Sequence, residues 1–470
     1  MQIPTRIMVL LTSALIALLS IDPVTASSAD ADQRGEQWIG TWAAAPQPPL
    51  PGAVQSFRNQ TLRLIVHTSV GGTKARIKIS NTYGDQPLSI GGAHIARRTA
   101  GADIDPASDR TLKFHGQSST IIPARSMVVS DPVDLDVPAL SDLAVSLFLP
   151  KATEARTSHI LAKQTSYVFP ETSDSTAGIK FPVASKLHSW PFLTGVDVAA
   201  SSGAIAIVAF GSSLTDGDGS TTDTNMRWPD VLAERSQKEG GRKNVGVMNE
   251  GIIGNRLLSD SPQQEGSPFG AALGQSGLAR FERDVLTQDG VKYVIIALGI
   301  NDIAFPGSLT PASAMVSAES MISGYRQLIA RGHEKGVRII GSTNPPFEDA
   351  FLTKPAVTFY TPEKEAVRQK VNAWIRTSGE FDGIIDFDEV VRDPNHPTRL
   401  LPAYDSGDHL HPNNAGYAAS GKAIPLNLFN VDLQVGGWWV RGAPEPALSL
   451  SKVLARLLGA LSWDSCRGFS

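Results

Sequence analysis

The sequence has 470 residues, of which 41% are hydrophobic and 19% are charged. This balance is typical of a folded protein with a large core, it excludes an intrinsically disordered chain, and the length allows two or three domains. The formal net charge of −4 argues against general nucleic-acid binding, so we expect no nucleic-acid partner.

The N-terminal segment, residues 1–26, is typical of a secretory signal peptide. Arg6 supplies positive charge, residues 8–21 are apolar, and Val24 and Ala26 provide the small residues that suit cleavage after Ala26. The apolar stretch is short for a membrane span, and an uncleaved membrane anchor is the alternative. We therefore expect a secreted or periplasmic protein with no integral membrane span once the signal is removed.

Residues 27–37 are small and polar and indicate a linker, and residues 38–190 have the pattern of an all-β domain. Short segments in that domain alternate apolar and polar residues or are rich in Val and Ile: residues 61–68, 75–80, 88–96, 119–122 and 143–149. Short strands at this spacing predict an N-terminal β-sandwich or jelly-roll-like domain.

The pattern changes near residue 204, and residues 200–430 read as an α/β domain. Buried apolar runs at residues 205–210, 245–248, 293–298, 337–341 and 383–387 alternate with helical segments at residues 229–236, 312–335 and 362–377. This alternation predicts a parallel sheet covered by helices on both faces.

Residues 431–470 form a C-terminal tail in which leucines recur at helical spacing between residues 450 and 461. The spacing predicts an amphipathic helix that docks on the rest of the protein. Contact with a membrane or a partner is the alternative.

Residues suited to acyl transfer follow the predicted parallel strands, where sites of open α/β sheets lie. Ser213 follows the first strand, Gly254 the second and Asn301 the third, and Asp408 and His411 lie near the end of the domain. Acyl transfer needs a nucleophile, a base, a group that orients the base, and donors for the oxyanion. We expect Ser213 as nucleophile, His411 as base and Asp408 as its orienting acid. The oxyanion hole would combine the N–H groups of Ser213 and Gly254 with the Asn301 amide.

These segments resemble the GDSL, or SGNH, hydrolase family, which is named for a serine, a glycine, an asparagine and a histidine in separate sequence blocks. They fall on Ser213, Gly254, Asn301 and His411, and Asp408 matches the family's DxxH motif. The resemblance covers about residues 204–428. It implies a flavodoxin-like three-layer α/β/α fold and hydrolysis of esters or, less often, thioesters, with no metal or organic cofactor.

The chain departs from the family at one position: Gly211-Ser212-Ser213-Leu214 stands where the family usually has Gly-Asp-Ser-Leu. The missing carboxylate leaves the support of the nucleophile loop open. Ser212 could supply the same loop hydrogen bonds, or the enzyme could be slower.

Other assignments of these residues are weaker. Ser212 would point away from the site if Ser213 points into it, and His409 is a rival to His411 as the base. Asp302 is expected to hydrogen-bond loop backbone. The run Asp216-Gly217-Asp218-Gly219 hints at a calcium loop, but Thr221 stands where such a loop requires glycine, so we expect no metal site.

We therefore expect a secreted serine carboxylic-ester hydrolase that forms an acyl-enzyme intermediate and acts on acylated carbohydrates or other small esters. A non-catalytic binding or adhesion module on the same fold is the alternative, motivated by Ser212 and by the β domain. The start of the β domain, residues 38–46, also resembles a subgroup of secreted bacterial SGNH hydrolases with an N-terminal extension. We expect the β domain to shape substrate access without supplying nucleophile, base or orienting acid, and we make no prediction of the oligomeric state.

Overall fold

The structure is a computed structural model that describes residues 36–170, 173–239, 244–263, 267–351 and 358–429. The predicted signal peptide and the predicted helix of the C-terminal tail lie outside the described residues. In the part of the chain that is described, no helix is long and apolar enough to span a membrane.

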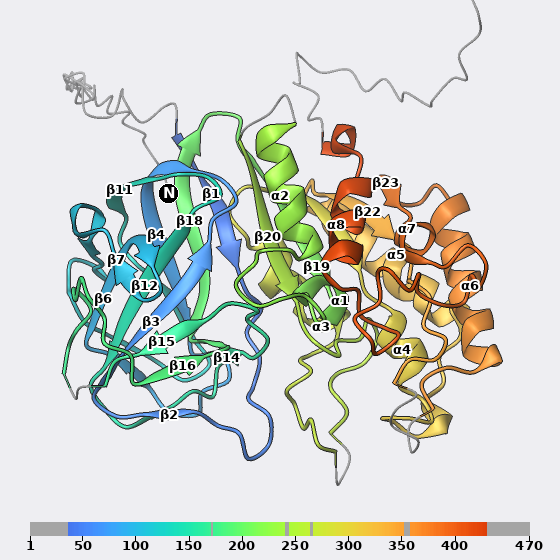
Figure 1. The fold of residues 1–470 in the computed structure, drawn as a ribbon, viewed down its shortest axis with the longest axis horizontal. Coiled ribbons are helices and arrows are strands. Elements are labelled where there is room, and N and C mark those ends of the chain that lie inside the picture. The colour runs from blue at the N-terminus through green and yellow to red at the C-terminus, as the bar shows by residue number, and fades with distance from the viewer. Residues whose placement is uncertain (1–35, 171–172, 240–243, 264–266, 352–357, 430–470) are drawn as a thin grey trace, which may run out of the picture. The chain divides into compact units, whose positions relative to one another are not determined.

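The N-terminal part of the described chain consists of antiparallel β-sheets (Figure 1). One large sheet has the strand order β1 (Glu36–Ala43), β18 (Leu193–Ser201), β4 (Gly72–Ser80) and β10 (Met127–Val129), with β11 (Val133–Val137) also paired to β4. The other has the order β16 (Ser185–Leu187), β15 (Ser166–Val168), β3 (Gln60–His67), β12 (Asp142–Leu149), β6 (Gly92–Ala100) and β7 (Asp103–Ile104), with β8 (Arg110–Thr111) paired to β6. Short two-stranded sheets pair β2 (Ser56–Phe57) with β13 (Thr153–Glu154), β14 (Ser158–His159) with β17 (Trp190–Pro191), and β5 (Leu88–Ile90) with β9 (Thr120–Ile122).

The two large sheets bury alternate side chains in a common core. Leu62 and Leu64 of β3 and Ile77 and Ile79 of β4 belong to the same hydrophobic cluster, as expected from the period of two in a strand. Ile65, on the other face of β3, packs in a separate cluster. The predicted sandwich-like β region is confirmed, and we refer to residues 36–201 as the β region.

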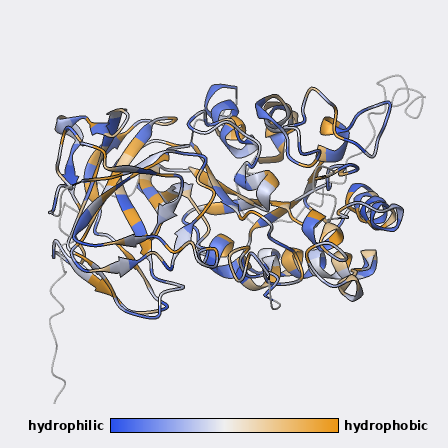
Figure 2. Cartoon of the chain, turned by 60° about the horizontal axis from the view of Figure 1, so that its bottom comes forward, coloured by the Kyte–Doolittle hydropathy of each residue, from blue (hydrophilic) through white to orange (hydrophobic). Residues whose placement is uncertain are grey.

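A five-stranded parallel sheet follows in the chain. Its strand order is β20 (Val245–Gly251), β19 (Ile205–Gly211), β21 (Val291–Ala297), β22 (Arg338–Ser342) and β23 (Gly383–Ile385). In chain order this is 2-1-3-4-5, the flavodoxin-like arrangement, so the predicted fold class is confirmed. The strands are largely buried because helices cover both faces of the sheet (Figure 2).

The helices up to α6 connect the strands of this α/β region, and α7 and α8 follow its last strand. The α-helices are α1 (Ser213–Asp216), α2 (Trp228–Lys238), α3 (Gly277–Phe281), α4 (Ile300–Ala304), α5 (Ala318–Glu334), α6 (Pro362–Thr377), α7 (Phe387–Val391) and α8 (Asn414–Ala423). Shorter helical turns are η2 (Pro106–Ser108) in the β region, and η3 (Glu282–Leu286), η4 (Ala312–Ala314) and η5 (Leu426–Phe429). Helix α8 contacts both α2 and α7, and α5 contacts both α3 and α6.

Some predicted elements differ in extent because of local capping. The helix predicted at residues 312–335 becomes the turn η4 followed by α5, since the Ser317 side chain accepts a hydrogen bond from the first turn and starts the helix there. The strand predicted at residues 383–387 ends early because Asp386 caps α7. Residues 88–96 fall in two strands, β5 and β6, and not in one.

The β region and the parallel sheet share one hydrophobic core. Ile39 of β1 and Met248 of β20 belong to the same cluster. Gly40 and Gly246 allow close backbone approach at this contact, because a Cβ atom on Gly246 would collide with the Gly40 carbonyl oxygen. Strand β1 includes the last two residues of the expected linker. Strand β18 lies wholly after residue 190, the expected end of the β domain. The predicted domain boundaries stay a prediction.

Candidate active site

Ser213 lies at the junction between β19 and α1 (Figure 1). Strand β19 ends at Gly211, Ser212 has an extended backbone, and Ser213 is the first residue of the short helix. A first-turn backbone N–H has no partner within its own helix, so the Ser213 N–H faces away from α1. Helix α1 ends at Asp216 and is capped by Gly217, whose φ of 103° is the left-handed conformation that glycine adopts readily.

Ser213, His411 and Asp408 form a continuous chain of hydrogen bonds. The Ser213 Oγ atom lies 2.8 Å from His411 Nε2, and His411 Nδ1 lies 2.6 Å from Asp408 Oδ2. The other carboxylate oxygen, Asp408 Oδ1, accepts the backbone N–H groups of Leu410 and His411 at 2.9 and 2.8 Å. The structure therefore brings together the three residues that the sequence nominated.

The charge of Asp408 determines which ring nitrogen of His411 carries a proton. Burial favours the neutral carboxyl, but hydrogen bonds and the charge of His411 outweigh it and lower the pKa of Asp408 to about 2. An ionised carboxylate only accepts, so His411 Nδ1 carries a proton and donates it to Asp408. In the neutral imidazole Nε2 is then free to accept the Ser213 proton, which is the arrangement that a general base requires.

The two further oxyanion donors nominated by the sequence lie at the ends of the neighbouring strands. Gly254 follows β20 with a φ of 70°, and its close neighbour Leu273 leaves no room for a side chain there. Asn301 lies in the first turn of α4, directly after β21. Its Nδ2 atom donates to the Asn255 carbonyl oxygen at 2.9 Å, which orients the amide and leaves the second hydrogen for another acceptor.

Arg280 connects the loops that carry these residues, and sequence reasoning missed it. The side chain is fully buried and donates to the carbonyl oxygens of Gly211 and Glu250 at 2.9 Å each and to Asn255 Oδ1 at 3.0 Å. Asp284, 3.1 Å away, supplies the opposite charge. The only sequence signal is an arginine one turn before an aspartate on a helix, a pattern that exposed surface pairs share.

Two of the weaker candidates have other roles. Asp302 accepts the backbone N–H groups of Leu257 and Leu258 at 2.6 and 2.9 Å, so its expected role in holding loop backbone is confirmed. Burial raises the pKa of Asp302 to about 6, although the two backbone hydrogen bonds act to lower it. His409 pairs with Asp405 at 2.5 Å and its side chain is 43% exposed, in contrast to the buried His411.

The idea that Ser212 replaces the hydrogen bonds of the family's aspartate is wrong. The Ser212 side chain is fully buried, yet its Oγ atom finds no hydrogen-bond partner among the described residues. A hydroxyl is shorter than a carboxylate and carries no charge, so it neither reaches nor attracts the same backbone donors. The loop is instead held by Arg280 at Gly211 and by Asn249, whose Nδ2 atom donates to the Thr215 carbonyl oxygen at 2.7 Å.

The acidic run after Ser213 has partners other than a metal ion. Asp216 is bonded to His159 and to the backbone of Ile253, and Asp218 lies 3.4 Å from Lys163. In the described ranges no group of three or more His, Cys, Asp or Glu residues is placed to hold a metal ion.

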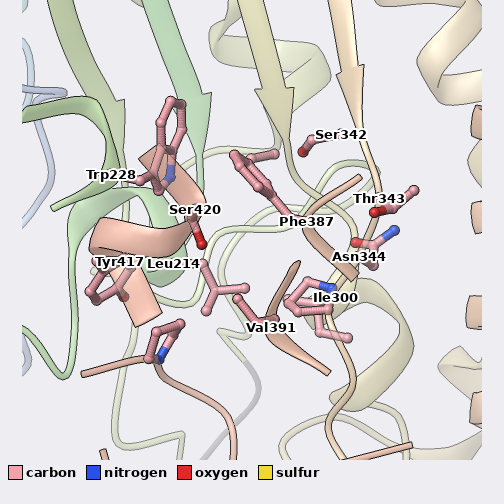
Figure 3. Close-up of a pocket in the computed structure, with 13 residues that line it drawn as sticks. Leu214, Trp228, Ile300, Ser342, Thr343, Asn344, Phe387, Val391, Tyr417 and Ser420 are labelled. Atoms are coloured by element: carbon pink, nitrogen blue, oxygen red, sulfur yellow. The ribbon is translucent and has the colours of Figure 1, made fainter. Parts of the chain in front are cut away.

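A small cavity is lined by residues next in sequence to the candidate site residues (Figure 3). It has a volume of about 30 Å³ and is lined by Leu214, Ile300 and Pro412, the neighbours in sequence of Ser213, Asn301 and His411. Ligand pockets typically measure about 300–1,000 Å³, so this cavity has room for water only. Its apolar walls pack the backbone from which the reacting side chains project.

Comparisons with known proteins define the class of this fold and site. Residues 207–424 match the family described as GDSL-like Lipase/Acylhydrolase. This part of the chain therefore belongs to that family, whose members are carboxylic-ester hydrolases, and is preceded by a β-rich region. A search of curated proteins found no match.

Similar solved structures align with about half of the chain. A GDSL-like lipase from Bacteroides thetaiotaomicron is 17% identical, and the match covers 47% of this chain and 87% of that one with a TM-score of 0.33. The native aryl esterase of M. smegmatis is 20% identical over 47% of this chain and 96% of its own, with a TM-score of 0.35. A carbohydrate acetylesterase from Sinorhizobium meliloti is 16% identical over 47% and 95%, with a TM-score of 0.34.

Proposed function

We propose that this protein hydrolyses carboxylic esters through an acyl-enzyme intermediate on Ser213, with His411 as general base and Asp408 as the acid that orients it. The observation that supports this proposal is the continuous chain from Ser213 Oγ through His411 to Asp408, with bonds of 2.8 and 2.6 Å. A nucleophile beside a base that is itself held by a third group is the arrangement on which covalent catalysis depends.

The first half of the reaction forms the acyl-enzyme. Ser213 Oγ attacks the acyl carbon while its proton passes to His411 Nε2, and Asp408 stabilises the imidazolium. Negative charge develops on the former carbonyl oxygen, where the N–H groups of Ser213 and Gly254 and the Asn301 amide stabilise it. The tetrahedral intermediate then collapses, and His411 gives its proton to the departing alkoxide, which leaves as the alcohol.

The second half releases the acid. His411, neutral again, takes a proton from a water molecule, whose oxygen attacks the acyl carbon of the ester on Ser213. The second tetrahedral intermediate collapses, the Ser213 oxygen regains a proton from His411, and the carboxylic acid leaves. Apart from the ester and one water molecule, each step uses only groups of the chain.

We propose acylated carbohydrates or other small esters as substrates. Ser213 is 3% exposed and His411 4%, so the reacting atoms lie below the surface, which favours a short acyl group that reaches them without displacing much of the protein. Turnover measured on a panel of acetylated sugars, p-nitrophenyl esters of increasing chain length and phospholipids tests this proposal. Preference for long acyl chains or phospholipids would contradict it.

We also propose secretion to the periplasm or the medium, because residues 1–26 have the pattern of a signal peptide. N-terminal sequencing of the protein recovered from the periplasm or medium should begin at Ser27. Recovery of the uncleaved chain in a membrane fraction would contradict this proposal.

The alternative function is a non-catalytic binding module. Turnover of p-nitrophenyl acetate that disappears in Ser213→Ala supports the esterase. A protein that binds esters or sugars but shows no turnover, or turnover that Ser213→Ala leaves unchanged, would support the binding module.

A further inference from the structure

A histidine of the β region reaches the helix that carries Ser213. His159, at the end of β14, places its Nε2 atom 2.9 Å from Asp216 Oδ1 and its Nδ1 atom 2.9 Å from the carbonyl oxygen of Ala45. Asp216 is the last residue of α1, three positions after Ser213. The side chains of His159 and Asp216 are 3% and 1% exposed, so solvent does not screen the pair.

The partners of the ring define its charge. The Ala45 carbonyl oxygen only accepts hydrogen bonds, and so does an ionised Asp216, so both ring nitrogens of His159 must donate. Burial opposes protonation of the ring, but the charge of Asp216 and the two hydrogen bonds outweigh it and raise the pKa of His159. The pair is therefore a buried imidazolium–carboxylate ion pair, and removal of one partner would leave the other charge uncompensated.

Asp216 also contacts the loop that carries Gly254. Its second oxygen, Oδ2, accepts the backbone N–H of Ile253 at 2.9 Å, one residue before Gly254. Gly251 packs so closely against α1 that a Cβ atom there would collide with the Asp216 backbone nitrogen. Asp216 thus joins the helix that starts with Ser213 to the loop that presents Gly254.

We propose that His159 is a positioning residue for ester hydrolysis. It acts through Asp216 to keep Ser213 and Gly254 in the correct position relative to one another. This inference rests on the function proposed above and deepens it. The nucleophile, base and orienting acid proposed above all lie in the α/β region, and the β region would supply the cation that fixes the Asp216 carboxylate between the two loops.

The size of the effect follows from the sensitivity of acyl transfer to geometry. A displacement of about 1 Å between reacting groups costs about 10²-fold in rate. We expect His159→Gln to lower kcat about 10- to 100-fold and to change KM less than about threefold, because the alignment of the reacting atoms is lost and not the binding surface.

The matched control is His67→Gln. His67 lies in the same region and pairs with Asp142 at 2.7 Å, but this pair joins β3 to β12 and does not touch α1. Both variants lose one histidine–aspartate pair of the β region, so a general loss of β-region stability affects both. We expect His67→Gln to keep kcat within about twofold of the wild type.

The full-length wild type, both glutamine variants, Asp216→Asn and the double variant His159→Gln/Asp216→Asn are compared by turnover of p-nitrophenyl acetate and by amide hydrogen exchange. We expect faster exchange in residues 213–217 and 251–255 of His159→Gln, with no change there in His67→Gln. Because His159 acts through Asp216, the double variant should lose no more activity than the worse single variant.

A folded His159→Gln with kcat within twofold of wild type would overturn the proposal, and so would losses that multiply in the double variant or an equal loss in His67→Gln. If His159→Gln fails to fold, Asp216→Asn decides in its place: unchanged kcat and unchanged exchange in residues 251–255 overturn the proposal. Ser213→Ala, assayed in parallel, separates this failure from failure of the proposed function, since the exchange measurement does not depend on turnover.

Discussion

The β region and the α/β region each contain a series of contacts from a hydroxyl through an imidazole to a carboxylate, and we propose acyl transfer for the one in the α/β region alone. In the β region Thr111 Oγ1 lies 3.2 Å from His94 Nε2, and His94 Nδ1 lies 2.9 Å from Asp109 Oδ2. The order of groups is the same as from Ser213 through His411 to Asp408, where the corresponding distances are shorter, 2.8 and 2.6 Å. A hydroxyl, an imidazole and a carboxylate in line therefore do not by themselves make a site.

The difference lies in the backbone around the hydroxyl. Thr111 is exposed and sits opposite His94 in the antiparallel ladder between β6 and β8, where backbone N–H groups are used in pairing. Ser213 begins a helix at the carboxyl end of a parallel strand, beside the ends of the two neighbouring strands. Parallel topology brings backbone N–H donors and a nucleophile together at the edge of the sheet where the strands end. An antiparallel ladder does not.

The largest expected effect separates these two hydroxyl groups. Ser213→Ala should lower kcat/KM for p-nitrophenyl acetate by about 10⁴-fold or more, because the triad acts as a unit and the nucleophile is lost. Thr111→Ala should leave kcat/KM unchanged, since Thr111 lies in an antiparallel ladder, where backbone N–H groups are used in pairing. Steady-state kinetics of the two variants check this prediction.

Ser212→Ala is the nearest control for Ser213→Ala. The Ser212 hydroxyl is buried and has no hydrogen-bond partner in the part of the chain that the structure describes, so its removal should cost far less activity. If Ser212→Ala is the inactive variant and Ser213→Ala is not, the assignment of the nucleophile is wrong.

The next largest effect concerns the oxyanion donors that distinguish the two regions. Asn301→Ala should lower kcat about 10²–10³-fold with a smaller change in KM, because the amide stabilises charge that develops only in the transition state. Steady-state kinetics with p-nitrophenyl acetate give both constants. A rise in KM at constant kcat would instead make Asn301 a substrate-binding residue.

A smaller and graded effect is expected from pH. The pKa of Asp408 is lowered to about 2, so this carboxylate stays ionised as pH falls, and the loss of activity on the acid side should reflect one protonation and not two. An imidazolium cannot accept the serine proton, so kcat/KM should fall about tenfold per pH unit on that limb. An acid limb that requires two protons would contradict an ionised Asp408.

Much of the fold and of the candidate site could be predicted because both depend on local pattern. Apolar runs of strand length alternate with amphipathic helices, and Ser213, Gly254 and Asn301 each follow such a run, so parallel topology brings these three residues to one edge. The helix at residues 362–377 was predicted to the residue, since Thr361 and Pro362 start it at a position that the sequence alone reveals.

The features that could not be predicted depend on contacts distant in sequence. His159 and Asp216 are separated by 57 positions and Arg280 and Gly211 by 69, and no periodicity links them. Strand β18, with small residues such as Gly195 and Ala199, lacks a strong strand pattern, and its pairing with β1 and β4 defines it. Such contacts follow from tertiary packing, which determines which polar groups are buried together.

The central claim is that Ser213, and no other hydroxyl, is the nucleophile. The most direct measurement is to treat the full-length protein with a fluorophosphonate, digest it and locate the phosphonylated residue by mass spectrometry. We predict a single adduct on Ser213, absent from Ser213→Ala and from protein inactivated at low pH. An adduct on Ser212 or Thr111, or labelling that persists in Ser213→Ala, would contradict the account.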